Sequence, residues 1–385
     1  MPEILTPPFI LTCLSQFTFS VALYILLPTL PIYLSRLGSN ETEIGLLVGA
    51  FAAGSVVFRP LVGKILSRHS EKKVMIAGAF LFTLTSAALL LVRPFWPFLG
   101  ARVFQGIAYA LFNTAIFTLA VNITPETRRG QSLSWALLSL NFALALGPSL
   151  GMTIVNRFGF TPLFIVCAGL SICTLFIALG IKRPQPFLPF DPLPEDRALL
   201  NRKALSPSCV AFLHNLCWGA VAAFLPLYAV EKGVANPGVF FSAMAFTMML
   251  GRAFGGRLLD AYDKDKMIYV LIAGFIFVMA IVACSETLPM LVISGVLWGT
   301  AAGFLMPTLM ATAMDRVGPT ARGSAVGTYT ALYDLGIAAG PVMAGVVTRF
   351  AGYTGMFVGL ILVEMFNLAC FHVFVRQRGK TGSSL

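Results

Sequence analysis

Two carboxylates lie deep inside apolar stretches of this 385-residue sequence. Asp334 lies about 13 residues into the stretch 321–347, which is roughly 20 Å along a helix that rises 1.5 Å per residue. Removal from water favours the protonated form of a carboxyl group, and a nearby cation reverses that preference. We therefore take Asp334 as the first candidate for a proton carrier and Glu364 as the second. The alternative for Asp334 is a polar residue satisfied at a helix interface by Thr330 or Tyr333.

Arg102 is a cation in a similar position, within the apolar stretch 95–122. If that stretch crosses a bilayer, an arginine inside it costs at least about 2.5–3.5 kcal/mol, so we expect it to have a partner or a task. The residue lies about 10 Å from the nearer end of its stretch, however. Snorkelling of the side chain to the surface is the alternative.

The composition indicates where these groups reside. Apolar residues make up 57% of the chain and charged residues only 11%, which excludes an ordinary water-soluble protein. The formal net charge is +11, but the basic residues lie in short connections between apolar runs, which favours orientation in a membrane over binding to nucleic acid. The seven cysteines fall inside apolar stretches without metal-ligand spacing, so we interpret them as core residues and expect no metal.

Apolar runs of spanning length recur along the whole chain. A helix that crosses a bilayer needs about 20 mostly apolar residues, because lipid offers its backbone no hydrogen-bond partners. Twelve such runs occur, at residues 8–34, 43–66, 73–93, 95–122, 130–155, 160–181, 207–230, 237–259, 267–285, 288–315, 321–347 and 353–375. The sequence thus predicts an all-α membrane protein with 12 transmembrane helices.

The basic residues predict the orientation of these spans. Nineteen of the 27 lysines and arginines lie on one side of the topology, five lie on the other, and three lie inside spans. Short cytoplasmic loops are enriched in such residues. We therefore expect both termini in the cytoplasm, and the short loops suit a bacterial inner (plasma) membrane.

The chain divides into two similar halves. The longest connection, at 182–206, is rich in proline and mixed charge, as in a semi-extended linker, and separates bundles at 1–181 and 207–385. Arginine, glycine, proline and phenylalanine positions of the first half recur in the second half at an offset of 193 residues. The pairs are Arg59 and Arg252, Gly63 and Gly256, Gly106 and Gly299, Arg129 and Arg322, Gly130 and Gly323, Gly147 and Gly340, Pro148 and Pro341, and Phe164 and Phe357. Two such bundles are typical of an alternating-access carrier with its site between the halves.

Three local motifs add to this pattern. They are Gly63-Lys-Ile-Leu-Ser67-Arg68 after the second span, with a second copy at Gly256-Arg257-Leu-Leu-Asp260, then Arg102-Val-Phe-Gln105-Gly106 in the fourth span, and Gly147-Pro148-Ser-Leu-Gly151 in the fifth. They resemble, in that order, the G-x-x-x-D-R-x-G-R-[RK] loop, the R-x-x-Q-G motif and the G-P-x-x-G antiporter motif of the major facilitator superfamily. Within that superfamily the chain resembles the drug and metallophore efflux branch.

The resemblance implies a fold of two pseudo-symmetric six-helix bundles, with Arg102 taking part in proton coupling. It implies gating roles for the loop residues Gly63, Arg68, Gly256, Asp260 and Arg322. The first loop has Ser67 where the family has aspartate, whereas the second retains Asp260, for which Arg322 is the expected partner. The alternative for both loops is a solvated turn.

The resemblance also implies export, through the antiporter motif Gly147, Pro148 and Gly151 and its second copy Gly340 and Pro341. A generic helix kink is the competing explanation for these residues. Further polar residues inside spans are cavity candidates, although each of them alone is more often a contact between helices. They are Gln16, Asn113, Asn141, His214, Asn215 and Tyr333.

The sequence therefore predicts a secondary active transporter that exports a small amphipathic or lipophilic molecule by proton antiport. Uptake or lipid flipping by the same scaffold is the alternative, and a membrane-embedded enzyme or a channel belongs to a different class. The sequence contains neither HExxH nor a complete P-loop, and no filter-like repeat. We expect no cofactor and no nucleic acid. The expected partners are a small-molecule substrate, protons and the lipid bilayer, and the expected state is a monomer.

Overall fold

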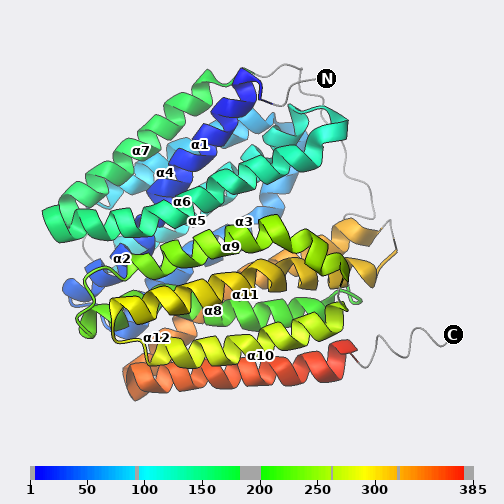
Figure 1. Ribbon diagram of the computed structural model, residues 1–385. Helices are drawn as coiled ribbons and strands as arrows, with labels where there is room; N and C mark the ends of the chain where they lie inside the picture. Colours follow the sequence, from blue (N-terminus) through cyan, green and yellow to red (C-terminus); the bar gives the residue numbers. More distant parts are fainter. Residues whose placement is uncertain (1–4, 92–94, 183–200, 262, 319–320, 377–385) are drawn as a thin grey trace. The chain divides into compact units, whose positions relative to one another are not determined.

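The protein is helical throughout the residues that the structure describes. The structure, a computed structural model, describes residues 5–91, 95–182, 201–261, 263–318 and 321–376 (Figure 1). In these ranges every regular element is a helix. The helices form two compact units: unit 1 contains residues 1–39 and 50–191, and unit 2 contains residues 40–49 and 192–385. The predicted linker falls mainly on residues 183–200, which lie outside the described ranges, so the bundle boundaries stay a prediction.

The amino-terminal part of the chain forms seven α-helices within the described residues. They are α1 (Pro7–Tyr24), α2 (Leu26–Arg36), α3 (Glu41–Arg68), α4 (Glu71–Ala88), α5 (Phe95–Asn122), α6 (Arg129–Phe158) and α7 (Phe160–Gly180). A 3₁₀ turn at Glu126–Arg128 leads into α6.

The first predicted span, 8–34, is two helices, because α1 ends at Tyr24 and α2 begins at Leu26. Pro28 explains the break: it has no N–H to bond the carbonyl of Tyr24, four residues earlier. At the other end of α2, Arg36 lies over the ring of Phe160, 5.3 Å from its centroid.

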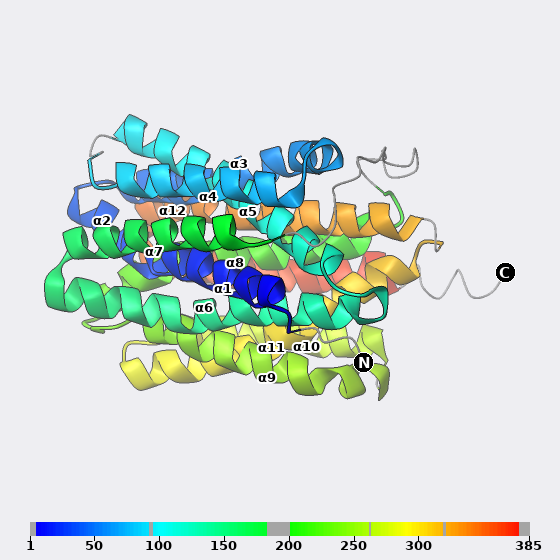
Figure 2. The ribbon, with the colours of Figure 1, turned by 90° about the horizontal axis from the view of Figure 1, so that it is seen from above.

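Aromatic rings fill the interior of unit 1. The ring of Phe19 on α1 stacks on that of Phe112 at 3.9 Å between centroids and contacts that of Phe82 at 4.4 Å. Helix α1 packs against α6 and α7, and α4 packs against α5 and α7 (Figure 2). The Lys72 ammonium donates to the Leu179 carbonyl at 2.9 Å, which joins the start of α4 to the end of α7.

Unit 2 contains the remaining long helices. They are α8 (Leu205–Glu231), α9 (Gly238–Ala261), α10 (Lys264–Ala283), α11 (Leu288–Asp315) and α12 (Arg322–Cys370), followed by a π-helical turn at Phe371–Arg376. Helix α8 packs along α12, and α9 packs along α11. Asp263 caps α10 by accepting bonds from the backbone N–H groups of Asp265 and Lys266.

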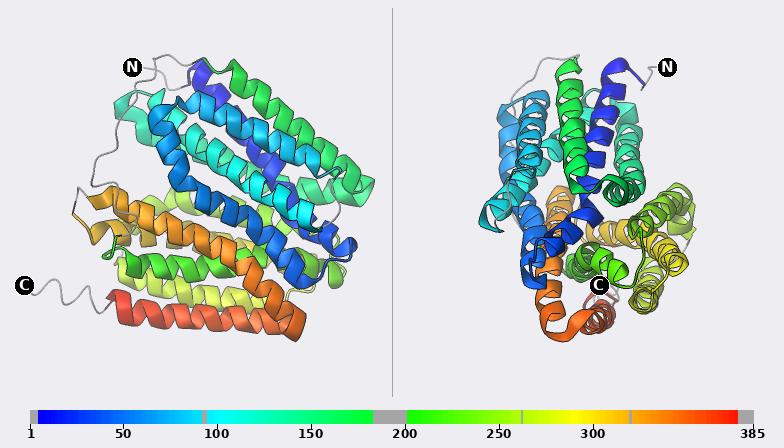
Figure 3. Two further views of the ribbon diagram at one scale, coloured as in Figure 1. Left: turned by 180° about the vertical axis from the view of Figure 1, so that it is seen from behind. Right: turned by 90° about the vertical axis from the view of Figure 1, so that its left-hand side faces the viewer.

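Helix α12 contains two of the predicted spans, joined at a sharp bend (Figure 3). Gly352 has φ of +66° and ψ of −177°, a conformation that residues with a Cβ rarely adopt. The part before Gly352 corresponds to the predicted span 321–347, and the part after it corresponds to 353–375.

The two units repeat one close helix crossing. A Cβ atom on Gly106 of α5 would lie 1.9 Å from the Phe51 carbonyl oxygen of α3, and one on Gly299 of α11 would lie 2.0 Å from the Met244 carbonyl oxygen of α9. Both the glycines and the carbonyls are separated by the 193-residue offset of the repeat. Glycine at each crossing lets the backbones touch.

The long helices suit a membrane. In the described part of the chain nine helices are long and apolar enough to cross a bilayer; one of them is α1 with α2, and another is the whole of α12. The shorter apolar helix Gly238–Arg252 and α4 account for further predicted spans. Exposed apolar side chains such as Phe176, Phe277 and Phe350 supply surface that lipid can cover.

Candidate functional site

A buried carboxylate and imidazole meet in unit 2. His214 Nδ1 lies 2.8 Å from Glu364 Oε1, and the Asn367 amide donates to Glu364 Oε2 at 3.2 Å. Glu364 and Asn367 are 0% exposed and His214 is 2% exposed. We call these three residues the buried polar cluster.

Two helices bring the buried polar cluster together. His214 lies in the middle of α8, and Glu364 and Asn367 lie one turn apart on α12 after its bend. The imidazole also contacts the rings of Phe275, at 4.2 Å between centroids, and Trp298, at 6.1 Å. Apolar walls therefore enclose the ionisable pair.

The hydrogen bond in the cluster can run in either direction. His214 Nδ1 donates to the Glu364 carboxylate when that nitrogen carries a hydrogen, and a Glu364 carboxylic acid would donate to Nδ1 when it does not. The Asn367 carbonyl oxygen is buried and has no hydrogen-bond partner in the protein. This oxygen can therefore accept a hydrogen bond from a further donor, such as a water molecule.

Cys217 lies beside the cluster, one turn after His214 on α8. Its thiol is 0% exposed and lies 3.7 Å from the Leu360 carbonyl oxygen of α12. All seven cysteines are free, and Cys284 is an exposed one.

Asp334, the first candidate for a proton carrier, lies on α12 before the bend and is half-buried. Tyr333 beside it is also half-buried, and its ring lies 6.3 Å from that of Tyr329. The Thr330 hydroxyl donates to the Val326 carbonyl at 2.9 Å. The second candidate, Glu364, is the one that the structure encloses completely.

Arg102 is buried in unit 1 and does not snorkel, because only 6% of it is exposed. Its guanidinium donates to Gln105 one turn along α5, and its central carbon lies 4.7 Å from the centroid of the Phe51 ring. The arginine and the glutamine of the R-x-x-Q-G motif are thus hydrogen-bonded to each other. The glycine of the motif, Gly106, leaves room for the α3 backbone at Phe51. Arg102 belongs to unit 1, whereas Asp334 and Glu364 belong to unit 2.

The remaining cavity candidates are buried within their own units. In unit 1 the Gln16 amide donates to the Ser20 hydroxyl at 2.9 Å, whereas Gln16 Oε1 and Asn113 Oδ1 have no hydrogen-bond partner. Asn141 on α6 is 6% exposed. In unit 2 the Asn215 amide donates to the Ala211 carbonyl at 2.7 Å, which is a contact within α8.

The G-P-x-x-G motif packs α6 against the break between α1 and α2. A Cβ on Gly147 would lie 2.8 Å from Cβ of Tyr24, and one on Gly151 would lie 2.4 Å from the Ile25 carbonyl oxygen. Helix α6 continues through Pro148.

The second copy of the motif packs α12 closely against α8. A Cβ on Gly340 would lie 2.1 Å from the Leu216 carbonyl oxygen, and α12 continues through Pro341. Close packing, with no break of the helix at either proline, is the structural role of both copies.

The loop residues lie at helix ends. Gly63 and Arg68 are exposed near the end of α3, and Arg322 is exposed at the start of α12. Gly256 and Asp260 lie on α9, but the side chains of residues 253–261 are outside the described part of the chain. Glu71 stands where the loop motif has its second arginine; it is buried and accepts a hydrogen bond from the Asn122 amide of α5.

The sequence identified Glu364 and His214 separately but not their pairing. Glu364 and Asn367 share a helix face, which the spacing of three residues indicates. His214 lies 150 residues away in the chain, and no local pattern links it to Glu364. In the described part of the molecule, no three histidine, cysteine, aspartate or glutamate side chains gather closely enough to hold a metal ion.

Comparison with known proteins gives a consistent family. The sequence profile of the Major Facilitator Superfamily matches residues 12–341 and 237–384. The staphylopine export protein of Staphylococcus aureus is 24% identical over 375 residues, with 92% of this chain and 94% of that protein aligned. A multi-drug resistance efflux pump PmrA homolog of Lactococcus lactis is 22% identical, with 96% of each chain aligned.

Solved structures show the same fold. A bacterial homolog of the human lysosomal transporter Spinster superposes with a TM-score of 0.77 at 14% identity and covers 96% of each chain. The nucleoside transporter NupG superposes with a TM-score of 0.74 at 18% identity, covering 96% of this chain and 99% of that one. These structures and the family profile confirm the predicted fold class, and membership of a transporter family confirms the prediction that the chain is not an enzyme. The chain is a multi-pass membrane protein that belongs to the Major Facilitator Superfamily of transporters.

Proposed function

We propose that this transporter exports a small amphipathic or lipophilic molecule across the bacterial inner membrane in exchange for protons. Two of the aligned relatives bear the names of an exporter and an efflux pump, which supports the direction. The close packing of Gly147 and Gly151 against Ile25 supports it too, since the motif resembles that of antiporters.

The proton coupling rests chiefly on the buried polar cluster. A carboxylate that is 0% exposed is costly unless it is protonated or paired, and Glu364 has His214 at 2.8 Å. Ionisable residues buried inside the membrane-spanning part of a protein usually mark a functional site, because burying them is costly.

The proposed cycle moves protons between these groups and water. When the transporter opens toward one side of the membrane, water reaches the cluster and the cluster takes up a proton from that side. When the transporter then opens toward the other side, the cluster releases the proton there. Asp334 and Arg102 are the further members of the coupling path that we propose. Buried amide oxygens without partners, on Gln16 and Asn113, are available to bind cargo in unit 1.

The proposal includes an arrangement in the membrane. Two six-helix bundles joined by the linker at 182–206 expose the cargo alternately to the two sides of the membrane. Both termini lie in the cytoplasm because of the basic bias, and a single copy of the chain suffices for transport.

Transport by the purified chain in liposomes tests the proposal. The assay imposes a pH gradient and offers lipophilic cations, neutral drugs and metallophore-like anions, and it compares wild type with Glu364→Gln, His214→Gln and Asp334→Asn. Asp315→Asn is the matched control, since Asp315 pairs with Lys264 in an exposed ion pair far along the chain from the cluster.

We expect gradient-driven transport that Glu364→Gln abolishes while cargo binding remains, with the control unchanged. Comparison of Glu364→Gln with Asp334→Asn shows which carboxylate carries the proton, because only the change at that residue abolishes gradient-driven transport. Transport that runs equally well without the gradient, or with both carboxylates replaced by amides, excludes proton exchange as the driving force.

A further inference from the structure

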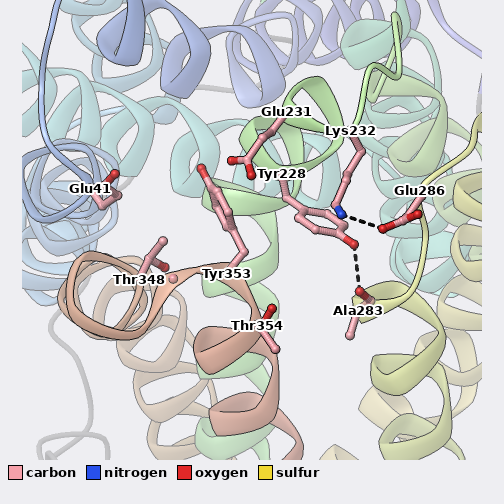
Figure 4. A pocket seen from close by; sticks show the side chains of 10 residues that line it. Glu41, Tyr228, Glu231, Lys232, Ala283, Glu286, Thr348, Tyr353 and Thr354 are labelled. Atoms are coloured by element: carbon pink, nitrogen blue, oxygen red, sulfur yellow. Dashed lines mark hydrogen bonds and ion pairs between the residues drawn. The ribbon is translucent and has the colours of Figure 1, made fainter.

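A polar pocket lies at one end of unit 2, where helix ends and the α12 bend converge (Figure 4). Its volume is about 420 Å³. By the basic bias of the sequence this is the non-cytoplasmic end. Its lining includes Glu41, Glu231, Lys232, Glu286, Thr348 and Tyr353.

The charges in this pocket do not balance. Lys232 pairs with Glu286 at 2.5 Å, and this hydrogen bond raises the pKa of the Lys232 ammonium, so the pair is neutral at pH 7. No ion pair joins Glu41 or Glu231 in the described part of the chain. The phenol of Tyr353 lies between these two carboxylates in Figure 4. Glu41 and Glu231 therefore face the pocket without an ion pair of their own, and the lining carries more carboxylates than ammonium groups.

A buried hydroxyl in the lining also lacks a partner. Thr348 is 5% exposed, yet its Oγ1 makes no hydrogen bond. Other threonines of unit 2 helices, such as Thr308 and Thr312, donate to the carbonyl four residues earlier. A buried polar atom left unpaired destabilises the folded protein, and a ligand group that bonds to it would remove that cost.

Specific backbone features hold these groups in place. Asn40 and Glu43 form a reciprocal capping box that fixes the first turn of α3, and thus Glu41. A Cβ on Gly345 would lie 2.4 Å from the Glu41 carbonyl oxygen, so α12 contacts this turn directly. The bend at Gly352 then returns Tyr353 to the same pocket.

The chemistry of the lining selects among cations. The three glutamates do not gather into a group that could hold a metal ion. Two phenol rings, Tyr228 and Tyr353, stand 5.8 Å apart, and aromatic faces attract organic cations. Carboxylates and a threonine hydroxyl accept hydrogen bonds, so a cation with N–H donors fits better than one without.

We propose that this pocket binds a primary ammonium group, paired with Glu41 and Glu231 and donating to the Thr348 hydroxyl. The ammonium belongs to a soluble amine or to the headgroup of an aminophospholipid at the membrane surface. This site is separate from the buried polar cluster, and its occupancy needs neither proton exchange nor transport.

Binding of ethanolamine to the purified full-length protein in lipid-depleted detergent tests the proposal, with choline as the matched cation that lacks N–H donors. Thermal unfolding against ligand concentration, cross-checked by titration calorimetry, gives the affinity. We expect ethanolamine to bind at least about tenfold more tightly than choline. Equal binding of the two cations, or binding of neither, overturns the proposal.

Variants assign the binding to this pocket. Glu231→Gln and Glu41→Gln are each expected to weaken ethanolamine binding about tenfold. Thr348→Val is expected to weaken it and Thr348→Ser to restore it, while Lys232→Gln strengthens it by releasing Glu286. Asp315→Asn is the carboxylate control. The proposal is overturned if this control weakens binding as much as Glu231→Gln does.

Nanodiscs distinguish the two sources of the ammonium. In phosphatidylcholine discs the affinity for ethanolamine is expected to match that in detergent. A fall in affinity in phosphatidylethanolamine discs identifies the lipid headgroup as the natural occupant, and an unchanged affinity identifies a soluble amine. Loss of binding in discs of both kinds contradicts the site.

Discussion

At the scale of single residues, the chain places its costly groups in pairs. Glu364 faces His214, and Arg102 donates to Gln105 and lies over Phe51. Removal of one partner leaves the other buried without compensation and destabilises the folded protein, whereas removal of both partners leaves no such uncompensated group.

A double-mutant cycle on Glu364 and His214 follows from this. Glu364→Ala is expected to destabilise the folded protein by about 3–5 kcal/mol, because the imidazole keeps its burial and loses its acceptor. His214→Ala with Glu364→Ala should cost less than the sum of the single changes, with a coupling of about 0.5–3 kcal/mol. Unfolding in mild detergent measures each free energy, and additive values would show that the two side chains do not interact.

Arg102 gives a second residue-scale prediction. Arg102→Lys keeps the charge but loses the planar group that stacks on Phe51 and bonds Gln105. We expect a loss of about 1–2 kcal/mol in stability and slower gradient-driven transport. Arg157→Lys, at an exposed position in the last turn of α6, is the control, and equal behaviour of the two variants would contradict the role assigned to the stacked guanidinium.

At the scale of helices, contact between backbones matters more than bending. Gly106 and Gly299 each admit a carbonyl oxygen of a neighbouring helix. Gly106→Ala and Gly299→Ala are expected to destabilise the protein by about 1–3 kcal/mol through overpacking. Gly169→Ala on α7 and Gly274→Ala on α10 are controls because a Cβ there meets nothing within 4 Å. Similar thermal midpoints for the crossing variants and the controls would refute the argument.

Helices were the more predictable part of this molecule. Long apolar runs separated by charge predicted the spans, because a bilayer imposes one length and one backbone structure. The break at Ile25 and the bend at Gly352 were not predicted, since Pro28 and Gly352 are compatible with several local conformations. The pairing of His214 with Glu364 and the pocket around Thr348 depend on contacts between distant segments, which no periodicity records.

At the scale of the whole molecule, the two units do not follow the chain order completely. Residues 40–49 belong to unit 2, where a Cβ on Gly45 would lie 2.3 Å from the Pro341 carbonyl oxygen. A piece that begins at residue 207 therefore lacks one of its own packing partners.

A split chain tests this consequence. Co-expression of residues 1–206 with residues 207–385 is expected to restore transport, whereas the second piece alone should unfold at a lower temperature than the reassembled protein. Fluorescence-detected size-exclusion after heating measures both. A second piece as stable alone as in the pair would mean that residues 40–49 contribute nothing to unit 2.

The buried thiol of Cys217 can report the separation of two helices in unit 2. Its thiol is sealed between α8 and the last part of α12, beside Glu364 and against the Leu360 carbonyl. A thiol reagent can reach it only when those two helices separate, so its rate of alkylation in the native protein reports how often they do. Cys284, exposed in the same unit, calibrates the reagent. If proton exchange at Glu364 requires the same separation, Cys217 alkylation should quicken under turnover and stay slow at rest.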